Sequence, residues 1–177
     1  MPRLLVLFSK TDVMKFIGHL DLLTLFQRAI NRAGLPVRYS QGFNPHQKVG
    51  FAAPLPLGVE GLNEVAEITL EKYCEPYDAA LSLAKQMPRH LFIKDARMAE
   101  EYEKKSAALA CAAKYKIRPR EGEETEVTLN LAGGLKQYMK EFKIPDYTYV
   151  SRIELLRKTE SGLVPLYQIY KGNNHES

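Results

Sequence analysis

The chain has 177 residues, 45% of them apolar, and a formal net charge of +4 at pH 7. This length and composition exclude a disordered tail and allow one sizeable core or two small domains packed together. The two cysteines, Cys74 and Cys111, have no CxxC motif or clustered histidines nearby, which argues against a zinc site or a disulfide framework, so we expect both to be small core residues.

Positive charge is concentrated in the first 54 residues. That segment holds seven Lys and Arg against two Asp, so its balance is 7 − 2 = +5, whereas the rest of the chain holds 18 basic against 19 acidic residues, or −1. Because steering and counterion release act through a local patch, this distribution favours an anionic partner bound by the N-terminal segment. Nucleic acid is the leading candidate.

The first predicted elements are a strand and a helix. Residues 3–9 are apolar on both faces of a strand pattern, which is typical of a central strand covered from both sides. The apolar run in it, from Leu4 to Phe8, spans five residues and is too short for a signal peptide or a membrane span, so we expect a cytoplasmic protein. Residues 18–33 then carry apolar side chains at helical spacing, and Gly34 supplies the stop.

Four more elements complete the first predicted domain. Residues 48–61 predict a strand that runs into a proline-stiffened turn, and residues 64–71 alternate apolar and polar as in a half-buried strand. Residues 89–96 form a last strand, and before it a helix starts at Pro76, with an apolar side made of Ala80, Leu81, Ala84 and Met87. The order β-α-β-β-α-β predicts an α+β fold with a ferredoxin-like domain over residues 1–98.

The charged segment 99–105 is the predicted boundary to a second, smaller α+β unit, residues 106–177, packed against the first. Its predicted elements are a helix over residues 134–142, a hairpin turn at 158–162 and strands over 108–120, 125–131, 147–156 and 163–170. The first of these strands carries alternating basic residues on one face, namely Lys114, Lys116, Arg118 and Arg120. That pattern indicates either an RNA-contacting face or an edge strand protected by charge.

The polar side of the first helix forms a stripe at i, i+3, i+4 spacing. His19 stands at the helix entry, and the stripe consists of Asp21, Thr24, Arg28, Asn31 and Arg32. A solvated helix face has the same pattern. The alternative is a binding surface, because the loop that follows returns toward the C-terminal end of the helix.

The loop YSQGFNPHQK, residues 39–48, carries aromatic, amide and basic groups that we expect to meet the stripe over one pocket: Tyr39, Ser40, Asn44, His46 and Lys48. Gly42 permits a positive φ and Pro45 restrains its predecessor to an extended conformation, so the loop has a defined shape. Phe43 is either a plug that anchors the loop in the core or a stacking platform for a base. His46 could bind phosphate, act as an acid or base, or cap a turn.

The segment from Phe16 to Gly58 joins GHLD, RAINRA, LPVRYS and GFNPH in one order and spacing. It resembles the core motif of the radical SAM-linked protein family, a domain of unknown function fused to, or encoded beside, radical S-adenosylmethionine proteins. Glu67 stands where family members usually show an aspartate. Members also tend to lie near genes for ribosomal proteins and a ribonuclease, which points to RNA. The resemblance implies a shared surface, with no established reaction, made of His19, Asp21, Arg28, Arg32, Tyr39, Ser40, Gly42, Phe43, Asn44, Pro45 and His46.

No iron–sulfur CxxxCxxC, P-loop, GxGxxG or HExxH motif occurs, so we expect no metal site in this chain and place the iron–sulfur cluster and S-adenosylmethionine in a partner protein. The expected function is a non-catalytic accessory protein of a radical S-adenosylmethionine enzyme. It would bind structured RNA or another phosphate-rich ligand through Arg28, Arg32, Tyr39, Ser40, Phe43, Asn44, His46 and Lys48. One alternative is a pure protein–protein adaptor, and the other is a metal-independent RNA-processing or RNA-modifying enzyme with catalytic candidates His19, Asp21 and His46.

Overall fold

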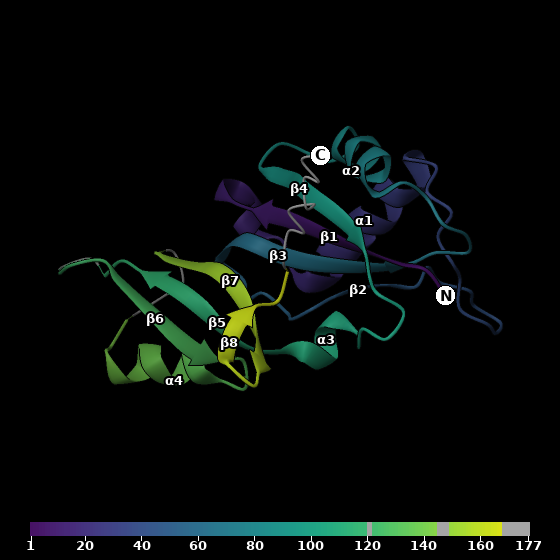
Figure 1. The fold of residues 1–177 in the computed structure, drawn as a ribbon. Coiled ribbons are helices and arrows are strands. Elements are labelled where there is room, and N and C mark those ends of the chain that lie inside the picture. The colour runs from purple at the N-terminus through teal and green to yellow at the C-terminus, as the bar shows by residue number, and fades with distance from the viewer. Residues whose placement is uncertain (120–121, 145–148, 168–177) are drawn as a thin grey trace, which may run out of the picture.

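A single sheet of eight strands runs through both halves of the protein (Figure 1). The computed structural model describes residues 1–119, 122–144 and 149–167. The mixture of one sheet with helices confirms the predicted α+β class. No helix among the described residues is long and apolar enough to cross a membrane.

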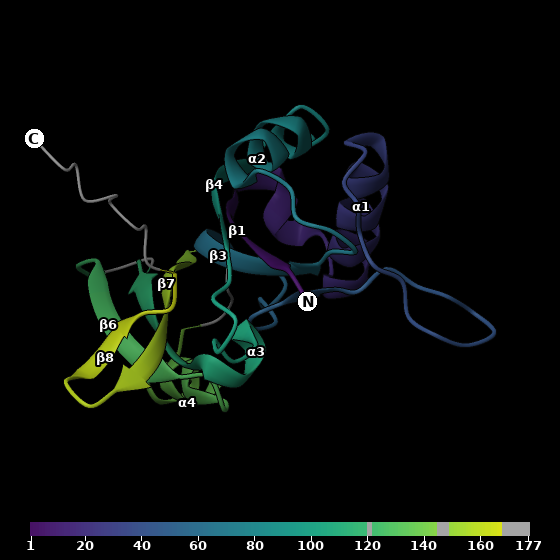
Figure 2. The same ribbon diagram turned by 45° about the vertical axis from the view of Figure 1, so that its right-hand side comes forward.

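The first half has the predicted order of strands and helices, with one added 3-10 helix. The elements are β1 (Arg3–Lys10), η1 (Asp12–Phe16), α1 (His19–Arg32), β2 (Val49–Phe51), β3 (Glu60–Thr69), α2 (Pro76–Ala84) and β4 (Leu91–Met98). The strands lie in the order β4-β1-β3-β2, and every neighbouring pair is antiparallel. Helices α1 and α2 cover the same face of this part of the sheet (Figure 2). As predicted, Gly34 follows α1 in the left-handed region, with φ of 67°.

The second half adds four strands and two helices. They are α3 (Ser106–Leu109), β5 (Ala110–Ile117), β6 (Thr125–Asn130), α4 (Gly134–Glu141), β7 (Val150–Thr159) and β8 (Gly162–Pro165), with the predicted hairpin joining β7 to β8. Strand β7 joins the two halves because it pairs in parallel with the start of β3, opposite Glu60 and Gly61. Strand β2 pairs with β3 further along, at residues 66–68.

Strand β1 has an apolar core on each face, as predicted from its continuous hydrophobic run. Leu4, Val6 and Phe8 lie in the cluster under α1 and α2. Leu5 and Leu7 lie in a second cluster that is formed largely by β5, β7 and α4 of the other half. Burial on both sides removes most of the apolar surface of this strand from water, which is the main source of its stabilisation.

The expectations for the buried side of α2 and for Cys111 are wrong, and so is the edge-strand alternative for β5, because packing and register decide which residues are buried. Helix α2 buries Ala79 and Leu83 rather than the predicted side, and Leu81 is 45% exposed. Strand β5 lies between β6 and β7, so it is not an edge strand. Cys111 is exposed because the register of β5 shifts between residues 110 and 112, whereas Cys74 is half-buried.

Candidate functional site

The loop of residues 39–48 is a hairpin that projects from the sheet (Figure 2). Tyr39 and Gln47 form an antiparallel bridge, and the backbone N–H of Ser40 donates to the His46 carbonyl at 2.8 Å. The Ser40 hydroxyl oxygen accepts the backbone N–H of His46 at 3.0 Å and lies 2.8 Å from Nδ1 of the same residue. These bonds close the base of the loop, and Gly42 at its tip has φ of 127°.

Phe43 is fully exposed at the tip of this hairpin. The interpretation of Phe43 as a plug in the core is therefore wrong, because the closed base carries the tip away from the body of the protein. Asn44 and Pro45 beside it are exposed as well. An exposed aromatic ring on a loop with a closed base is consistent with the alternative interpretation of Phe43 as a stacking platform for a base.

Asn31 of the α1 stripe holds the base of the hairpin. Its Oδ1 atom accepts a hydrogen bond from Nε2 of Gln47 at 2.6 Å and from the Tyr39 hydroxyl at 3.4 Å. Gln47 is buried, although the sequence analysis gave it no role. Its position opposite Tyr39 in the hairpin is set by pairing, which the sequence alone does not specify.

A cavity of about 320 Å³ lies between the hairpin, β2, β3 and the start of α3. We call it the loop cavity; it is lined by His46, Gln47, Lys48, Val49, Gly50, Phe51, Glu67, Thr69, Lys105, Ser106 and Ala107. Lys48 and Lys105 are exposed, and the ammonium group of neither one has a hydrogen bond or ion pair among the described contacts. Glu67 is the only acidic residue in this lining.

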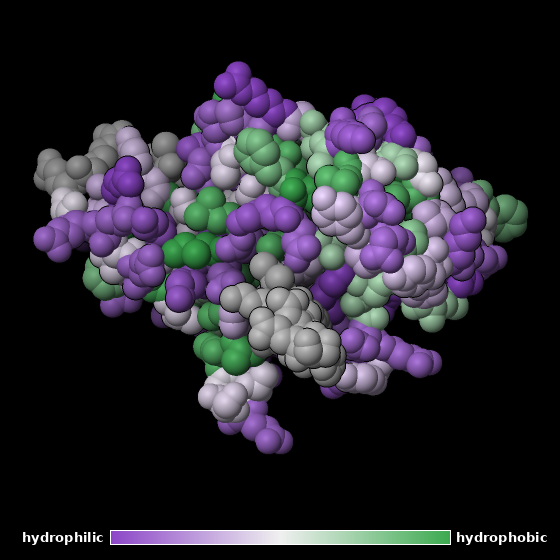
Figure 3. All heavy atoms as spheres, turned by 45° about the horizontal axis from the view of Figure 1, so that its top comes forward, coloured by the Kyte–Doolittle hydropathy of each residue, from purple (hydrophilic) through white to green (hydrophobic). Residues whose placement is uncertain are grey.

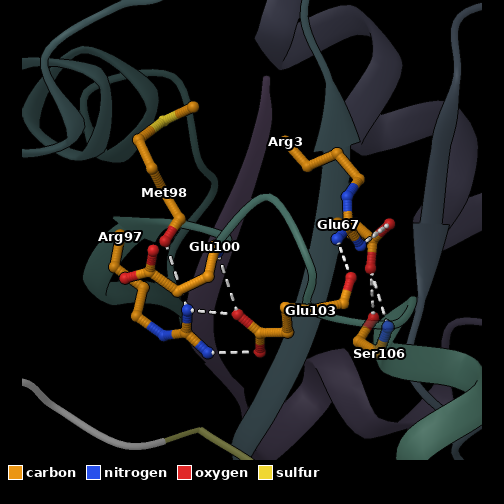
Figure 4. A network of polar contacts seen from close by, with 7 residues as sticks. All are labelled: Arg3, Glu67, Arg97, Met98, Glu100, Glu103 and Ser106. Atoms are coloured by element: carbon orange, nitrogen blue, oxygen red, sulfur yellow. Dashed lines mark hydrogen bonds and ion pairs between the residues drawn. The ribbon is translucent and has the colours of Figure 1, made fainter. Parts of the chain in front are cut away.

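The charge of Glu67 is already satisfied by its neighbours (Figure 4). Oε1 accepts from Nη1 of Arg3 at 3.1 Å, and Oε2 accepts from the backbone N–H and the hydroxyl of Ser106 at 2.8 and 2.9 Å. Glu67 is buried, although the alternation of β3 predicted an exposed face, because the segment 99–105 and α3 cover that side. The loop cavity therefore presents two free cations and a neutralised carboxylate.

The same network fixes the segment 99–105 to the sheet. Arg97 donates from Nη1 and Nη2 to the two carboxylate oxygens of Glu103 at 2.9 and 2.7 Å, and Arg3 donates to the Glu103 carbonyl. The hydrogen bonds from Arg97 lower the pKa of the Glu103 carboxyl. Glu103 precedes Lys105 in the chain and Ser106 follows it, and both are bonded to residues of the sheet. Lys105 is therefore held close to the sheet.

The α1 stripe lines a different cavity, of about 540 Å³, between α1 and the connection that follows α2. Asp21, Thr24, Arg28 and Arg32 all contribute to it. Arg32 donates from Nε and Nη2 to the side chain and carbonyl of Gln86 at 3.2 and 2.9 Å. On the face that carries α1 and α2, hydrophilic and apolar residues are intermixed (Figure 3). The expected single pocket is thus divided, with the arginines in one cavity and His46 and Lys48 in another.

His19 lies at a third, small cavity of about 10 Å³, which is room for about one water molecule. Its ring meets the edge of Phe51 with centroids 5.5 Å apart. An acid–base pair of the nuclease type needs two groups at one phosphate, and His19 and His46 line separate cavities. No group of three or more His, Cys, Asp or Glu that could hold a metal is found among the described residues.

The small cavity also touches a buried cluster that the sequence analysis missed. Arg152 and Glu64 are 1% and 3% exposed and form a two-pronged ion pair, with Nε–Oε1 at 2.8 Å and Nη2–Oε2 at 2.5 Å. Lys10 is 1% exposed and donates to the Ile17 carbonyl at 3.0 Å; burial lowers the pKa of its amine. The three residues come from β1, β3 and β7, and register alone brings them together.

Burial also revises the surface charge of the first 54 residues. Arg3 and Lys10 are engaged inside the protein, so five basic residues face two acidic ones near the surface, and the balance is 5 − 2 = +3. In the second half, Lys116 and Arg118 both pair with Glu124, at 2.7 and 2.8 Å, and Arg120 lies outside the described residues. Lys116 and Arg118 are thus paired, whereas Lys48 and Lys105 of the loop cavity have no ion pair among the described contacts, which favours the hairpin side as the site for an anion.

Comparison with known proteins places this architecture in a family. A family model described as "Uncharacterized protein conserved in bacteria (DUF2344)" matches residues 3–161, which includes both halves of the sheet. No curated protein matches the chain.

Proposed function

The chain belongs to the bacterial family DUF2344, and we propose that it is a non-catalytic protein that binds structured RNA for a radical S-adenosylmethionine enzyme. The observation that carries the RNA-binding part is Phe43, a fully exposed aromatic side chain at the tip of a hairpin with a closed base. A large apolar ring in water has no stabilising role in the free protein. Stacking on an unpaired base would bury it.

The charges around the hairpin support an anionic partner. Lys48 and Lys105 have no ion pair among the described contacts, and Arg28 lines the neighbouring helix cavity, also without one. These residues line two separate cavities, and only the loop cavity contains residues of the hairpin, so the hairpin and Lys48 with Lys105 form the proposed contact surface. Contacts of this kind make affinity dependent on salt.

The link to a radical enzyme rests on the resemblance of residues 16–58 to the radical SAM-linked family. The iron–sulfur cluster and S-adenosylmethionine would belong to the partner. In this arrangement the present chain supplies binding energy and orientation to the RNA substrate, and the partner supplies the chemistry.

A hairpin RNA with an unpaired loop, labelled with a fluorophore, tests the proposal by anisotropy at about 50 and 200 mM salt. We expect binding that weakens as salt rises, and about a tenfold loss for Phe43→Ala, which corresponds to one stacked base. Tyr77→Ala is the control, because Tyr77 is an exposed aromatic residue on α2, away from the hairpin. The proposal fails if no binding occurs at low salt, or if Phe43→Ala binds as well as Tyr77→Ala.

A protein-docking role has one observation in its favour. Val13, Phe16, Leu20 and Leu57 are each at least 58% exposed, and a backbone hydrogen bond of 2.9 Å from Gly58 to Lys15 ties their segments together. Exposed apolar residues grouped in this way are typical of a protein interface. A partner that co-purifies after nuclease treatment, and is lost in Phe16→Ser with Leu20→Ser, would favour the adaptor over the RNA-binding protein.

A further inference from the structure

The loop cavity is a recess with an uncompensated positive charge. Lys48 reaches it from the hairpin and Lys105 from the segment before α3, and neither is paired among the described contacts. Glu67 adds no free negative charge, since Arg3 and Ser106 occupy both of its oxygens. The two lysines that line the cavity therefore give its lining a net charge of about +2.

There is open space beside Gly50 in the lining of the cavity. This residue sits on β2 opposite Glu67, and a Cβ atom placed on it would meet nothing within 4 Å. The cavity volume of about 320 Å³ is at the lower end of the range for small-molecule sites. It accommodates a phosphate group with part of the attached nucleotide, rather than a folded peptide.

His46 adds a third donor. Its Nδ1 atom lies 2.8 Å from the Ser40 hydroxyl oxygen, which already accepts the backbone N–H of His46 at 3.0 Å. A hydroxyl that accepts one bond can still donate its own proton, and donation to Nδ1 is one of the two arrangements that this contact allows. In that arrangement the neutral ring carries its proton on Nε2, which then serves as an N–H donor.

We propose that the loop cavity binds a terminal phosphate monoester, the phosphorylated end of an RNA strand, an inference that rests on the proposed function. A phosphate monoester has a charge close to −2 at pH 7 and three terminal oxygens. Two lysines and one imidazole N–H match both its charge and its number of acceptors. An internal phosphodiester carries a single charge and leaves one lysine uncompensated.

Phe43 and the loop cavity then bind different parts of the strand end. The cavity holds the end phosphate, and the ring at the hairpin tip, three residues before His46, stacks on a base near that end. The hairpin base, braced by Asn31, keeps the two at a fixed separation. Selection of strand ends follows from this geometry, without any base-specific contact.

The test uses a six-nucleotide RNA with a 5′-phosphate, the same RNA with a 3′-phosphate, and the RNA with hydroxyls at both ends. We expect a phosphorylated end to bind about tenfold more tightly than the hydroxyl form. Lys48→Ala and Lys105→Ala should each abolish that preference, whereas Lys72→Ala, an exposed lysine outside the cavity, should retain it. Equal affinity of the wild-type protein for all three RNAs would overturn the inference and leave the proposed function standing.

Binding of uridine 5′-monophosphate distinguishes failure of the proposed RNA-binding function from failure of the phosphate site. If it binds the wild-type protein and Lys48→Ala removes the binding, the phosphate site is supported even when no RNA binds, and only the proposed function fails. If a phosphorylated RNA binds but uridine 5′-monophosphate at millimolar concentration does not, strand and phosphate are recognised together and the end-binding inference holds. Circular dichroism of each variant checks that the fold is retained.

Discussion

At the scale of single residues, the buried ion pair of Arg152 and Glu64 carries a high free-energy cost of burial. Burying two charges costs several kcal/mol for each ion, and good geometry is needed to offset that cost. The geometry is provided by two bonds between the side chains and two more from Arg152 to the carbonyls of Ala53 and Pro54, at 3.1 and 3.0 Å. Any change that moves Glu64 leaves Arg152 buried without its counterion.

Gly61 makes this pair possible. A Cβ atom at position 61 would lie 2.5 Å from Cγ and 2.9 Å from Oε1 of Glu64, so the carboxylate folds directly over the glycine. We predict that Gly61→Ala lowers the free energy of unfolding by about 3 kcal/mol, as when a buried ion pair is broken. Urea denaturation measures this, with Gly50→Ala on the neighbouring strand as the control. A loss no larger than that of the control would show that Glu64 can shift without losing Arg152.

The sequence could not have revealed this pair. Glu64 and Arg152 are 88 positions apart, and a single glutamate or arginine in a strand pattern is read as an exposed residue. The same limit applies to Glu67, which was assigned to a solvent face and is covered by a segment 39 positions away. Sequence patterns describe local periodicity, whereas these residues depend on register between distant strands.

At the scale of elements, long and strongly periodic segments were predictable. The continuous apolar run of β1 and the helical spacing of α1 identified both elements to within a residue or two of their ends. The predicted buried side of α2 and the edge-strand alternative for β5 were wrong, because both depend on which element packs next to them. At the candidate site, the sequence identified the residues of the hairpin but not the division into two cavities.

The segment 99–105 is held more firmly than a charged connector would suggest, and its acid sensitivity tests this. Arg97 lowers the pKa of Glu103 in the folded protein below the ordinary value of 4.5. The resulting stabilisation is present above pH 4.5 and is lost as the pH falls through the lowered pKa of the folded state. We predict that Glu103→Gln reduces the free energy of unfolding at pH 7 by about 1–3 kcal/mol and flattens its decline below pH 4.5.

Glu124→Gln is the matched control for this measurement. Glu124 also pairs with two basic side chains, Lys116 and Arg118, but it lies at the surface, where water and salt screen the interaction. A pH profile in which the two variants behave alike would mean that the Arg97–Glu103 pair contributes no more than an exposed one.

At the scale of the whole molecule, the predicted boundary between residues 98 and 106 crosses a continuous structure. Leu5 and Leu7 of β1 share a core with Tyr115 and Leu155, and β3 and β7 pair within one sheet. A first half separated from the second would expose one face of β1 and leave Glu64 without Arg152. Shared cores and shared ion pairs make unfolding cooperative across the elements that they join.

We therefore predict that both halves unfold in one transition. Hydrogen exchange followed by mass spectrometry at increasing urea should give the same midpoint for peptides from β1 and β4 as for peptides from β5 and β7, because the opening of either half exposes the core of the other. Arg152→Met keeps a long unbranched side chain but removes the link to Glu64, and it should lower both midpoints together. Two well-separated midpoints in the wild-type protein would instead establish residues 1–98 and 106–177 as independent domains.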